Sequence, residues 1–232
     1  MKSFLKKLYV NAEKLNHKNI LSLLENKSNP ILLDLGCDNG ELTKKLAEKI
    51  NTKNTYGVEI VEESIEKAKN NGLIVKKFDL NKKFDFEDNF FDVVNANQVI
   101  EHLYDSDNFL SEIYRILKPG GYVIISTENA SSWCNIFASI MGWQIFSLTN
   151  ISNKKQGIGN PFSLHRDDDP GLASWNHIRV YNIRGLKEYL KIFGFEVEQI
   201  KGAGYFPLPA FLGNIDKTHC HFMTFKARKI VK

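Results

Sequence analysis

The sequence has few cysteines, and their spacing serves no evident structural purpose. The three cysteines, Cys37, Cys134 and Cys220, are far apart, odd in number and without a paired CxxC arrangement. A disulfide framework or a zinc site is therefore excluded as the basis of the fold. Unpaired thiols are typical of a reducing compartment, so we expect a cytoplasmic protein.

Long apolar runs and blocks of one charge are also missing. No segment reaches the roughly 20 apolar residues of a membrane span, and the start, MKSFLKKLYV, has no apolar stretch long enough for a signal peptide. The net charge of +4 comes mostly from dispersed lysines, since arginine occurs only at positions 115, 166, 179, 184 and 228. This distribution is typical of solvated helix faces and argues against nucleic acid as a partner.

The composition does provide enough apolar side chains for one well-buried core. Hydrophobic residues make up 43% of the 232 positions and charged residues 25%, which suits one globular domain. We expect a single domain over 1–232, with an N-terminal helical cap at 1–28 and an insertion at 142–178. The insertion is rich in Gly, Asn, Asp, Ser and Pro, and a loop of this length is typical of a lid or binding loop.

Short apolar runs alternate along the chain with stretches of helical period. Strands are predicted at 31–35, 54–60, 73–80, 90–97, 120–129, 196–201 and 218–229, and helices at 13–26, 42–50, 62–72, 105–117, 133–140 and 182–195. This alternation specifies a doubly wound α/β fold with a mostly parallel sheet. The last two strands follow each other without a helix, so we expect an antiparallel C-terminal hairpin.

Two apolar stretches need separate interpretation. The segment 133–140 is expected to be the helix after the fifth strand and to cover the sheet. The segment 204–215 has too many prolines and glycines for an inner strand and too many apolar residues for an ordinary loop. It could form a wall of a ligand pocket, a dimer surface, or a contact with a lipid-linked ligand at a membrane. We take the pocket wall as the default and leave the oligomeric state open.

The first strand runs into a turn framed by Gly36 and Gly40, and in such sheets the ligand lies beyond the carboxyl ends of the strands. A nucleoside triphosphate loop would need a lysine directly after Gly40, which is missing. A dinucleotide site would have closely spaced glycines, but Asp38 takes the place of the second and Asp34 precedes the first. Two carboxylates would repel a pyrophosphate and attract a cationic ligand, which favours S-adenosylmethionine.

Five segments in order resemble class I S-adenosylmethionine-dependent methyltransferases. They are LLDLGCDNGELTKKLAE (32–48), YGVEI (56–60), FDL (78–80), FDVVNANQVIEHL (91–103) and LKPGGYVIIST (117–127). Each segment is weak by itself, whereas the ordered set is specific. The resemblance implies a Rossmann-like, seven-stranded sheet, S-adenosylmethionine as the cofactor, and methyl transfer as the reaction.

The same resemblance implies a set of cofactor-binding residues. These are Asp34, Gly36, Gly40, Glu59, Ile60, Asp79, Leu80, Asn97 and Gln98. Glu59 would accept hydrogen bonds from the ribose hydroxyls, and Asp79 with Leu80 would lie by the adenine. The positions after the first and fourth strands would contact the methionine part. The chain departs from the family at Asp38, where a glycine is often found.

A metal site is considered for the segment IEHL. Some related quinone O-methyltransferases bind a divalent metal here through two carboxylates and a histidine, and Glu101 with His102 would match two of those positions. Gln98 occupies the remaining position, and a neutral amide weakens a hard-cation site. We therefore expect no metal, with His102 positioning the cofactor loop.

The segment WNHIRVYNIRGLKEYLKIFGF (175–195) is similar to one that, in many class I methyltransferases, enters the last large helix beside the acceptor pocket. Alternation would put His177, Arg179 and Tyr181 on one face of an extended chain. His177 would be a general base, or Arg179 a clamp on an acidic acceptor; alternatively, both would only pin the insertion by hydrogen bonds. His165 is a weaker candidate.

Together these features predict a cytoplasmic S-adenosylmethionine-dependent methyltransferase with a small-molecule acceptor. The expected reaction is in-line transfer to a hydroxyl or carboxyl oxygen of a metabolite, sugar or lipid-linked glycan. One alternative is a methyltransferase acting on RNA or protein, although the chain has neither an arginine-rich face nor an Asn/Asp-Pro-Pro-Tyr motif. Another is a catalytically silent, cofactor-binding partner subunit.

Overall fold

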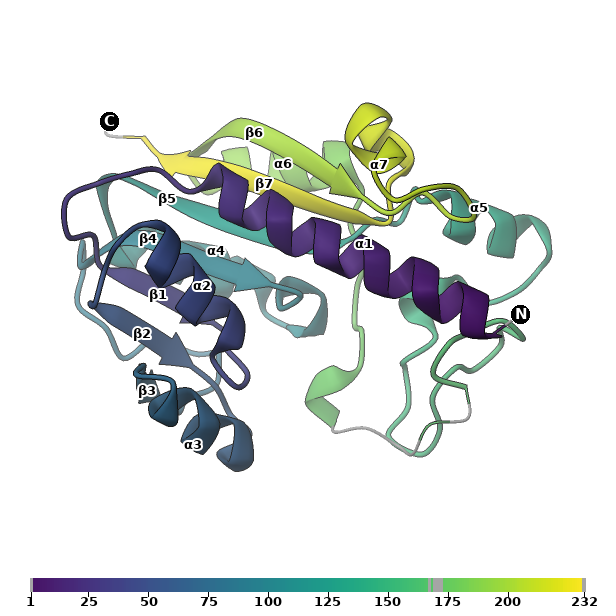
Figure 1. Ribbon diagram of the computed structural model, residues 1–232, viewed down its shortest axis with the longest axis horizontal. Coiled ribbons are helices and arrows are strands. Elements are labelled where there is room, and N and C mark those ends of the chain that lie inside the picture. Colours follow the sequence, from purple (N-terminus) through teal and green to yellow (C-terminus); the bar gives the residue numbers. More distant parts are fainter. Residues whose placement is uncertain (1, 167, 169–172, 231–232) are drawn as a thin grey trace.

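The computed structural model describes residues 2–166, 168 and 173–230, and its centre is a seven-stranded sheet in the order β3-β2-β1-β4-β5-β7-β6 (Figure 1). Neighbours among β1 to β5 pair in parallel. Strand β7 pairs antiparallel with both β5 and β6. The predicted doubly wound, mostly parallel sheet with an antiparallel C-terminal pair is thus confirmed.

The elements follow the predicted order of strands and helices. The strands are β1 (Leu32–Leu35), β2 (Thr55–Val58), β3 (Ile74–Lys76), β4 (Phe91–Asn97), β5 (Leu117–Glu128), β6 (Phe195–Ala203) and β7 (Phe222–Lys229). The helices are α1 (Lys2–Leu23), α2 (Glu41–Lys49), α3 (Glu62–Asn70), α4 (Ser106–Ile116), α5 (Trp133–Ile140), α6 (Ile183–Ile192) and α7 (Leu212–Ile215). Strand β3 is shorter than the predicted 73–80 because the chain leaves the sheet before Phe78.

Helices cover both faces of the sheet, and each face has its own apolar cluster. Leu32 belongs to the cluster under α1 and α2, which also contains Ile20 and Leu46. Its neighbour Leu33 belongs to the cluster on the other face, to which α4 contributes Phe109 and α6 contributes Leu186. Successive strand residues point to opposite faces, so both sides of the sheet are sealed. The carboxyl ends of the strands are left as the place where a ligand can enter.

The N-terminal helix is longer than predicted and begins at Lys2 rather than near residue 13. It crosses β5, β7 and β6 on the front of the sheet in Figure 1. Its buried face includes Asn16 and Asn19, each at most 4% exposed. Asn16 donates to Asn97 and accepts from Ser126 and Thr224. The turns before residue 13 were missed because none of the side chains from 3 to 11 is fully buried, so they form no clear apolar stripe.

The segment after β5 departs from the prediction. Helix α5 lies at the end of the molecule away from β1 to β4 (Figure 1), and Phe137 and Ile140 are 51% and 77% exposed. The prediction that it covers the sheet is therefore wrong. It packs instead on the insertion, where the side-chain amide of Asn135 donates to Ser147.

The described part of 142–178 contains only 3-10 turns and loops, while 167 and 169–172 lie outside the described residues. Within the described ranges no helix is long and apolar enough to cross a membrane.

Candidate active site

A cavity of about 600 Å³ lies at the carboxyl ends of β1, β2 and β4. Eight of the predicted cofactor residues line it, namely Asp34, Gly36, Glu59, Ile60, Asp79, Leu80, Asn97 and Gln98. Gly40 is not among the lining residues, although it shapes the turn beside them. The predicted residues are thus brought together at one edge of the sheet, while their individual contacts with a cofactor stay predictions.

The turn after β1 depends on glycine at two positions. Gly36 has a φ of 69°, and a Cβ there would lie 2.7 Å from Val99 Cγ2. Gly40 has a φ of 80°, and a Cβ there would lie 3.1 Å from the backbone of Ala68. Any larger residue would be strained and crowded at either place. Asp38, the departure from the family pattern, adopts a φ of 45° in the same turn and accepts a hydrogen bond from Ser64.

Asp34 is tied into the protein rather than free to point at a ligand. One carboxylate oxygen accepts from Thr43 Oγ1 at 2.5 Å, and the other accepts from Asn95 Nδ2 at 2.7 Å. Burial raises the pKa of Asp34 to about 7, although both hydrogen bonds act in the opposite direction. The side chain therefore holds β1, α2 and β4 together beneath the turn. The structure gives it a positioning role.

Glu59 lies at the end of β2 on the rim of the same cavity. One of its oxygens accepts from the backbone N–H groups of Ile60 and Val61, and the other accepts from that of Asp38. Three backbone bonds fix the carboxylate in one orientation, and each oxygen keeps lone-pair capacity for a further donor. This arrangement fits the predicted role of accepting hydrogen bonds from vicinal ribose hydroxyls.

The cavity also has lining residues that the sequence interpretation missed. Glu13 and His17 come from α1, and Trp175 comes from the insertion. With Asp34, Glu59 and Asp79 the acidic lining outweighs the cationic, which suits a ligand bearing sulfonium and ammonium charges. The residues present therefore fit S-adenosylmethionine. Glu13 and His17 are one helical turn apart within the predicted helix, but the sequence does not show that this helix passes beside the carboxyl ends of the strands.

A second cavity of about 410 Å³ adjoins the first. Gln98, His102 and Trp175 line both cavities, so these three residues mark where the two meet. Aromatic residues form much of the wall of the second cavity, including Tyr9, Phe146, Phe162 and Phe206. Of the 204–215 segment, the wall includes Phe206, whereas Phe211 and Ile215 are 58% and 75% exposed. The pocket-wall interpretation therefore holds only for the start of that segment.

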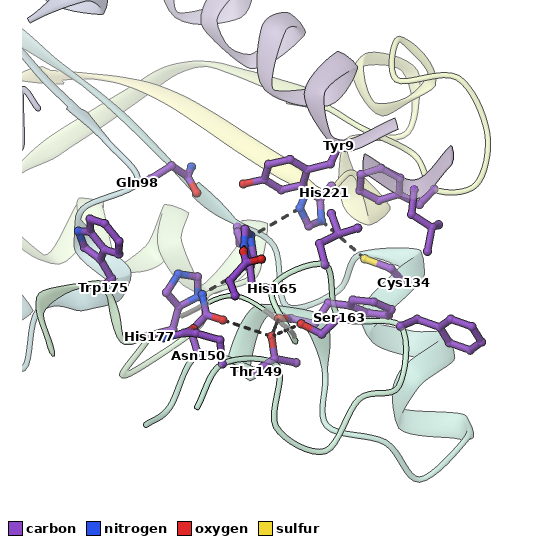
Figure 2. Close-up of a pocket in the computed structure, with 18 of the residues that line it drawn as sticks. Tyr9, Gln98, Cys134, Thr149, Asn150, Ser163, His165, Trp175, His177 and His221 are labelled. Atoms are coloured by element: carbon purple, nitrogen blue, oxygen red, sulfur yellow. Dashed lines mark hydrogen bonds and ion pairs between the residues drawn. The ribbon is translucent and has the colours of Figure 1, made fainter. Parts of the chain in front are cut away.

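His177 lines this second cavity, as predicted for an acceptor-site histidine. Its Nδ1 lies 2.6 Å from the backbone oxygen of Ser147. A carbonyl oxygen can only accept, so Nδ1 carries a proton and the neutral ring keeps a lone pair at Nε2. Figure 2 shows the His177 ring beside the cavity, between Trp175 and Asn150. This tautomer is the one that a general base acting through Nε2 requires.

Arg179 does not share that position. It lines neither of the two cavities, and its guanidinium donates to Ser106 Oγ and to the backbone oxygen of Tyr104. The interpretation as a clamp on an acidic acceptor is thus not supported by its placement. Arg179 pins the insertion to the segment before α4, which is the structural alternative.

A cluster of potential metal ligands lies near the junction of the cavities. Glu101, His102 and His177 offer ligand atoms within 4.8 Å of one another. Burial raises the pKa of Glu101 to about 7, and burial together with nearby His177 lowers the pKa of His102 to about 4. These three groups could hold a divalent cation, but the fourth nearby candidate, Gln98, is a neutral amide. The absence of a metal stays a prediction.

A second polar pair was missed from the sequence. Glu128 ends β5 and His221 precedes β7, and both line the second cavity. Glu128 Oε1 lies 3.9 Å from His221 Nε2, and its Oε2 lies 3.9 Å from His177 Nδ1. Burial works to raise the pKa of Glu128, but the histidines outweigh it and lower the pKa overall. An acid at a strand end was the signal used for Glu59, and it would have identified Glu128 as well.

Comparison with known proteins gives a family for this arrangement. The family described as "Methyltransferase domain" matches residues 9–200. The mitochondrial ubiquinone biosynthesis O-methyltransferase of Homo sapiens is 30% identical over 214 residues, covering 87% of this chain and 51% of that protein. An uncharacterized methyltransferase of Schizosaccharomyces pombe is 34% identical over 115 residues, covering 44% and 41%. The chain spans about half the length of such curated relatives.

Solved structures share the fold at low sequence identity. An S-adenosylmethionine-dependent methyltransferase of Thermotoga maritima, described as a possible histamine N-methyltransferase, has a TM-score of 0.62 at 19% identity, covering 97% of this chain and 94% of that one. A methyltransferase of Haloferax volcanii in complex with the activator Trm112 has a TM-score of 0.64 at 15% identity, covering 97% and 95%.

Fold and site together define a class I S-adenosylmethionine-dependent methyltransferase. The chain belongs to the methyltransferase-domain family, which confirms the resemblance drawn from its motifs. The cofactor implied by this family is S-adenosylmethionine.

Proposed function

We propose that the protein methylates an oxygen of a small-molecule acceptor, such as a metabolite, a sugar or a lipid-linked glycan. The observation that carries this proposal is the meeting of two cavities at Gln98, His102 and Trp175. One cavity has the cofactor residues, and the other has a histidine whose Nε2 can accept a proton. The ubiquinone O-methyltransferase relatives add support for an oxygen acceptor.

S-adenosylmethionine supplies, when bound, an electrophilic methyl group for in-line displacement. The residues of this chain orient the acceptor, exclude water and remove its proton. His177 Nε2 takes the proton of the acceptor hydroxyl, and the nearby carboxylate of Glu128 stabilises the imidazolium that forms. The aromatic wall formed by Phe146, Phe162 and Trp175 keeps the acceptor site poor in water.

We also propose that the protein is cytoplasmic, because the three cysteines would persist as free thiols in a reducing compartment. Peripheral contact with a lipid-linked acceptor is supported by exposed apolar residues near the acceptor cavity. Phe137, Ile140, Phe211 and Ile215 are each at least half exposed, while Phe206 of the same neighbourhood lines the cavity. Exposed apolar side chains on α5 and on the 204–215 segment would suit an apolar chain or a membrane surface.

Two other functions are kept as alternatives. A methyltransferase acting on RNA or protein is disfavoured by the volume of the acceptor cavity, about 410 Å³, which suits a small ligand better than a chain. A catalytically silent subunit that binds the cofactor beside a partner is the other. The Haloferax volcanii methyltransferase in complex with an activator illustrates such partnership for that protein.

The test is a methyl-transfer assay with isotopically labelled S-adenosylmethionine and fractionated small-molecule extracts. The proposal predicts label in a low-mass product, with the labelled methyl attached to oxygen when the product is identified by NMR. Label in RNA or protein instead would favour the first alternative. Cofactor binding without transfer to any fraction would favour the silent subunit.

A further inference from the structure

The acceptor cavity contains a buried carboxylate whose hydrogen-bonding capacity is not used. Glu128 is 8% exposed and His221 is 5% exposed. Within the described residues, Glu128 Oε2 and His221 Nε2 have no hydrogen-bond partner. Buried polar groups are rarely left unpaired in folded proteins. Because both side chains line the cavity, an entering molecule can supply the missing partner.

The charges around this pair are one-sided. The described residues lining the cavity include Glu128 and Asp168 but neither a lysine nor an arginine. Burial lowers the pKa of His221 despite the neighbouring carboxylate, so that histidine is neutral near pH 7. Arg179 is held by Ser106 and Tyr104 outside the cavity. A buried carboxylate that no lysine or arginine of the described lining compensates repels an anion and attracts a group that donates a hydrogen bond.

The surroundings of the pair also define the shape of the ligand. Tyr9 of α1 lies edge-on to His221, with ring centroids 5.9 Å apart, and Phe206 also packs edge-on to His221, with ring centroids 4.8 Å apart. Figure 2 shows Tyr9 and His221 on the side of the cavity facing His177 and Asn150. Because Tyr9 and Phe206 line the same cavity as Glu128, a ligand that reaches this carboxylate lies beside aromatic rings, which suits a compact apolar body carrying a polar head.

We propose that Glu128 and His221 form an acceptor subsite for a hydrogen-bond-donating head group, a hydroxyl or an ammonium, and that this subsite rejects acidic acceptors. This inference rests on the proposed function, because it assigns the second cavity to the methyl acceptor. It goes further by selecting neutral and cationic acceptors over carboxylates and phosphates at this position.

The experiment uses the full chain saturated with S-adenosylhomocysteine and three probes of equal size, 2-phenylethanol, 2-phenylethylammonium and phenylacetate. Saturation-transfer NMR gives the dissociation constant of each probe. The subsite predicts binding of the alcohol, the ammonium or both, at least tenfold tighter than phenylacetate. Glu128→Gln is expected to remove most of this discrimination, chiefly by admitting phenylacetate, a gain of binding that misfolding cannot produce.

The matched control is Asp168→Asn, which removes the same charge from the same cavity at a residue exposed to solvent and paired with His165. It should leave the ranking of the probes unchanged. Equal binding of phenylacetate to the native protein, no binding of any probe, or an unchanged ranking in Glu128→Gln would overturn the subsite. Binding of S-adenosylhomocysteine is measured separately, so its failure would count against the proposed function and not against the ranking.

Discussion

Thr43 of α2 donates a 2.5 Å hydrogen bond to Asp34 at the end of β1. The two residues flank the glycine turn, and the second oxygen of Asp34 is occupied by Asn95 of β4. Asp34, which was predicted to contact the cofactor, thus holds together the strands and the helix that flank the turn. Its effect on cofactor binding is expected to be transmitted through the backbone of the turn.

Thr43→Val should therefore weaken cofactor binding although Thr43 is fully buried. Loss of one hydrogen bond to a buried carboxyl group should cost about 1–3 kcal/mol of unfolding free energy and loosen the turn. We expect weaker binding of S-adenosylhomocysteine by calorimetry. Thr52→Val removes a hydroxyl bond to Pro30 at the opposite end of the sheet and should leave that affinity unchanged. Equal affinities in both variants would contradict the coupling.

Glu59→Gln should weaken binding of S-adenosylhomocysteine at least tenfold with little effect on the fold. The amide replaces one accepting oxygen by a donor, which opposes at least one of the three backbone N–H groups and any ribose hydroxyl bound on that side. Calorimetry and a thermal melt of the same sample measure the two effects. Glu63→Gln, on the exposed side of α3 beside Lys67, is the control and should bind normally. Native affinity in Glu59→Gln would remove the ribose assignment.

His177→Gln should lower turnover by about 100-fold, which is the scale of general-base catalysis, while the affinity for S-adenosylhomocysteine stays unchanged. The comparison variant is His165→Gln, because His165 lines the same cavity but is paired with Asp168 near solvent. Turnover is measured on the acceptor found in the extract assay. Native turnover in His177→Gln would reduce His177 to the structural role of holding Ser147.

His102 should make the stability of the protein fall in acid. Its pKa is about 4 in the folded protein against an ordinary 6.5, because burial disfavours the charged ring. Between these values the unfolded chain binds a proton that the folded protein does not, so the unfolding free energy decreases as pH falls from 6.5 to 4. The shift corresponds to about 3 kcal/mol. Urea unfolding at both pH values measures the slope, which should be smaller in His102→Gln; an identical slope would contradict burial of a neutral ring.

Much of the cofactor side could be predicted because it follows from topology. Parallel strands end at one edge of the sheet, so the acids after consecutive strands had to meet there, and Asp34, Glu59 and Asp79 do line one cavity. The same rule applied to β5 would have found Glu128. His221 could not be found in this way, because it precedes an antiparallel strand and reaches the site only through the register of β5 with β7.

The acceptor side was harder to predict because long-range packing forms it. Tyr9 enters the cavity from the first turns of α1, which precede the predicted start of that helix at residue 13. His177 and Arg179 alternate in sequence, yet one lines the cavity and the other pins the insertion from outside. Alternation fixes which residues share a face of an extended chain, whereas the surrounding loops decide what that face meets.

The central claim is that the turn from Gly36 to Gly40 belongs to a cofactor site for S-adenosylmethionine. Calorimetry of the purified protein with S-adenosylmethionine, S-adenosylhomocysteine and NAD in parallel tests it most directly. We predict binding of both sulfur compounds and no binding of NAD. Failure of both sulfur compounds to bind, or binding of NAD in their place, would contradict the account.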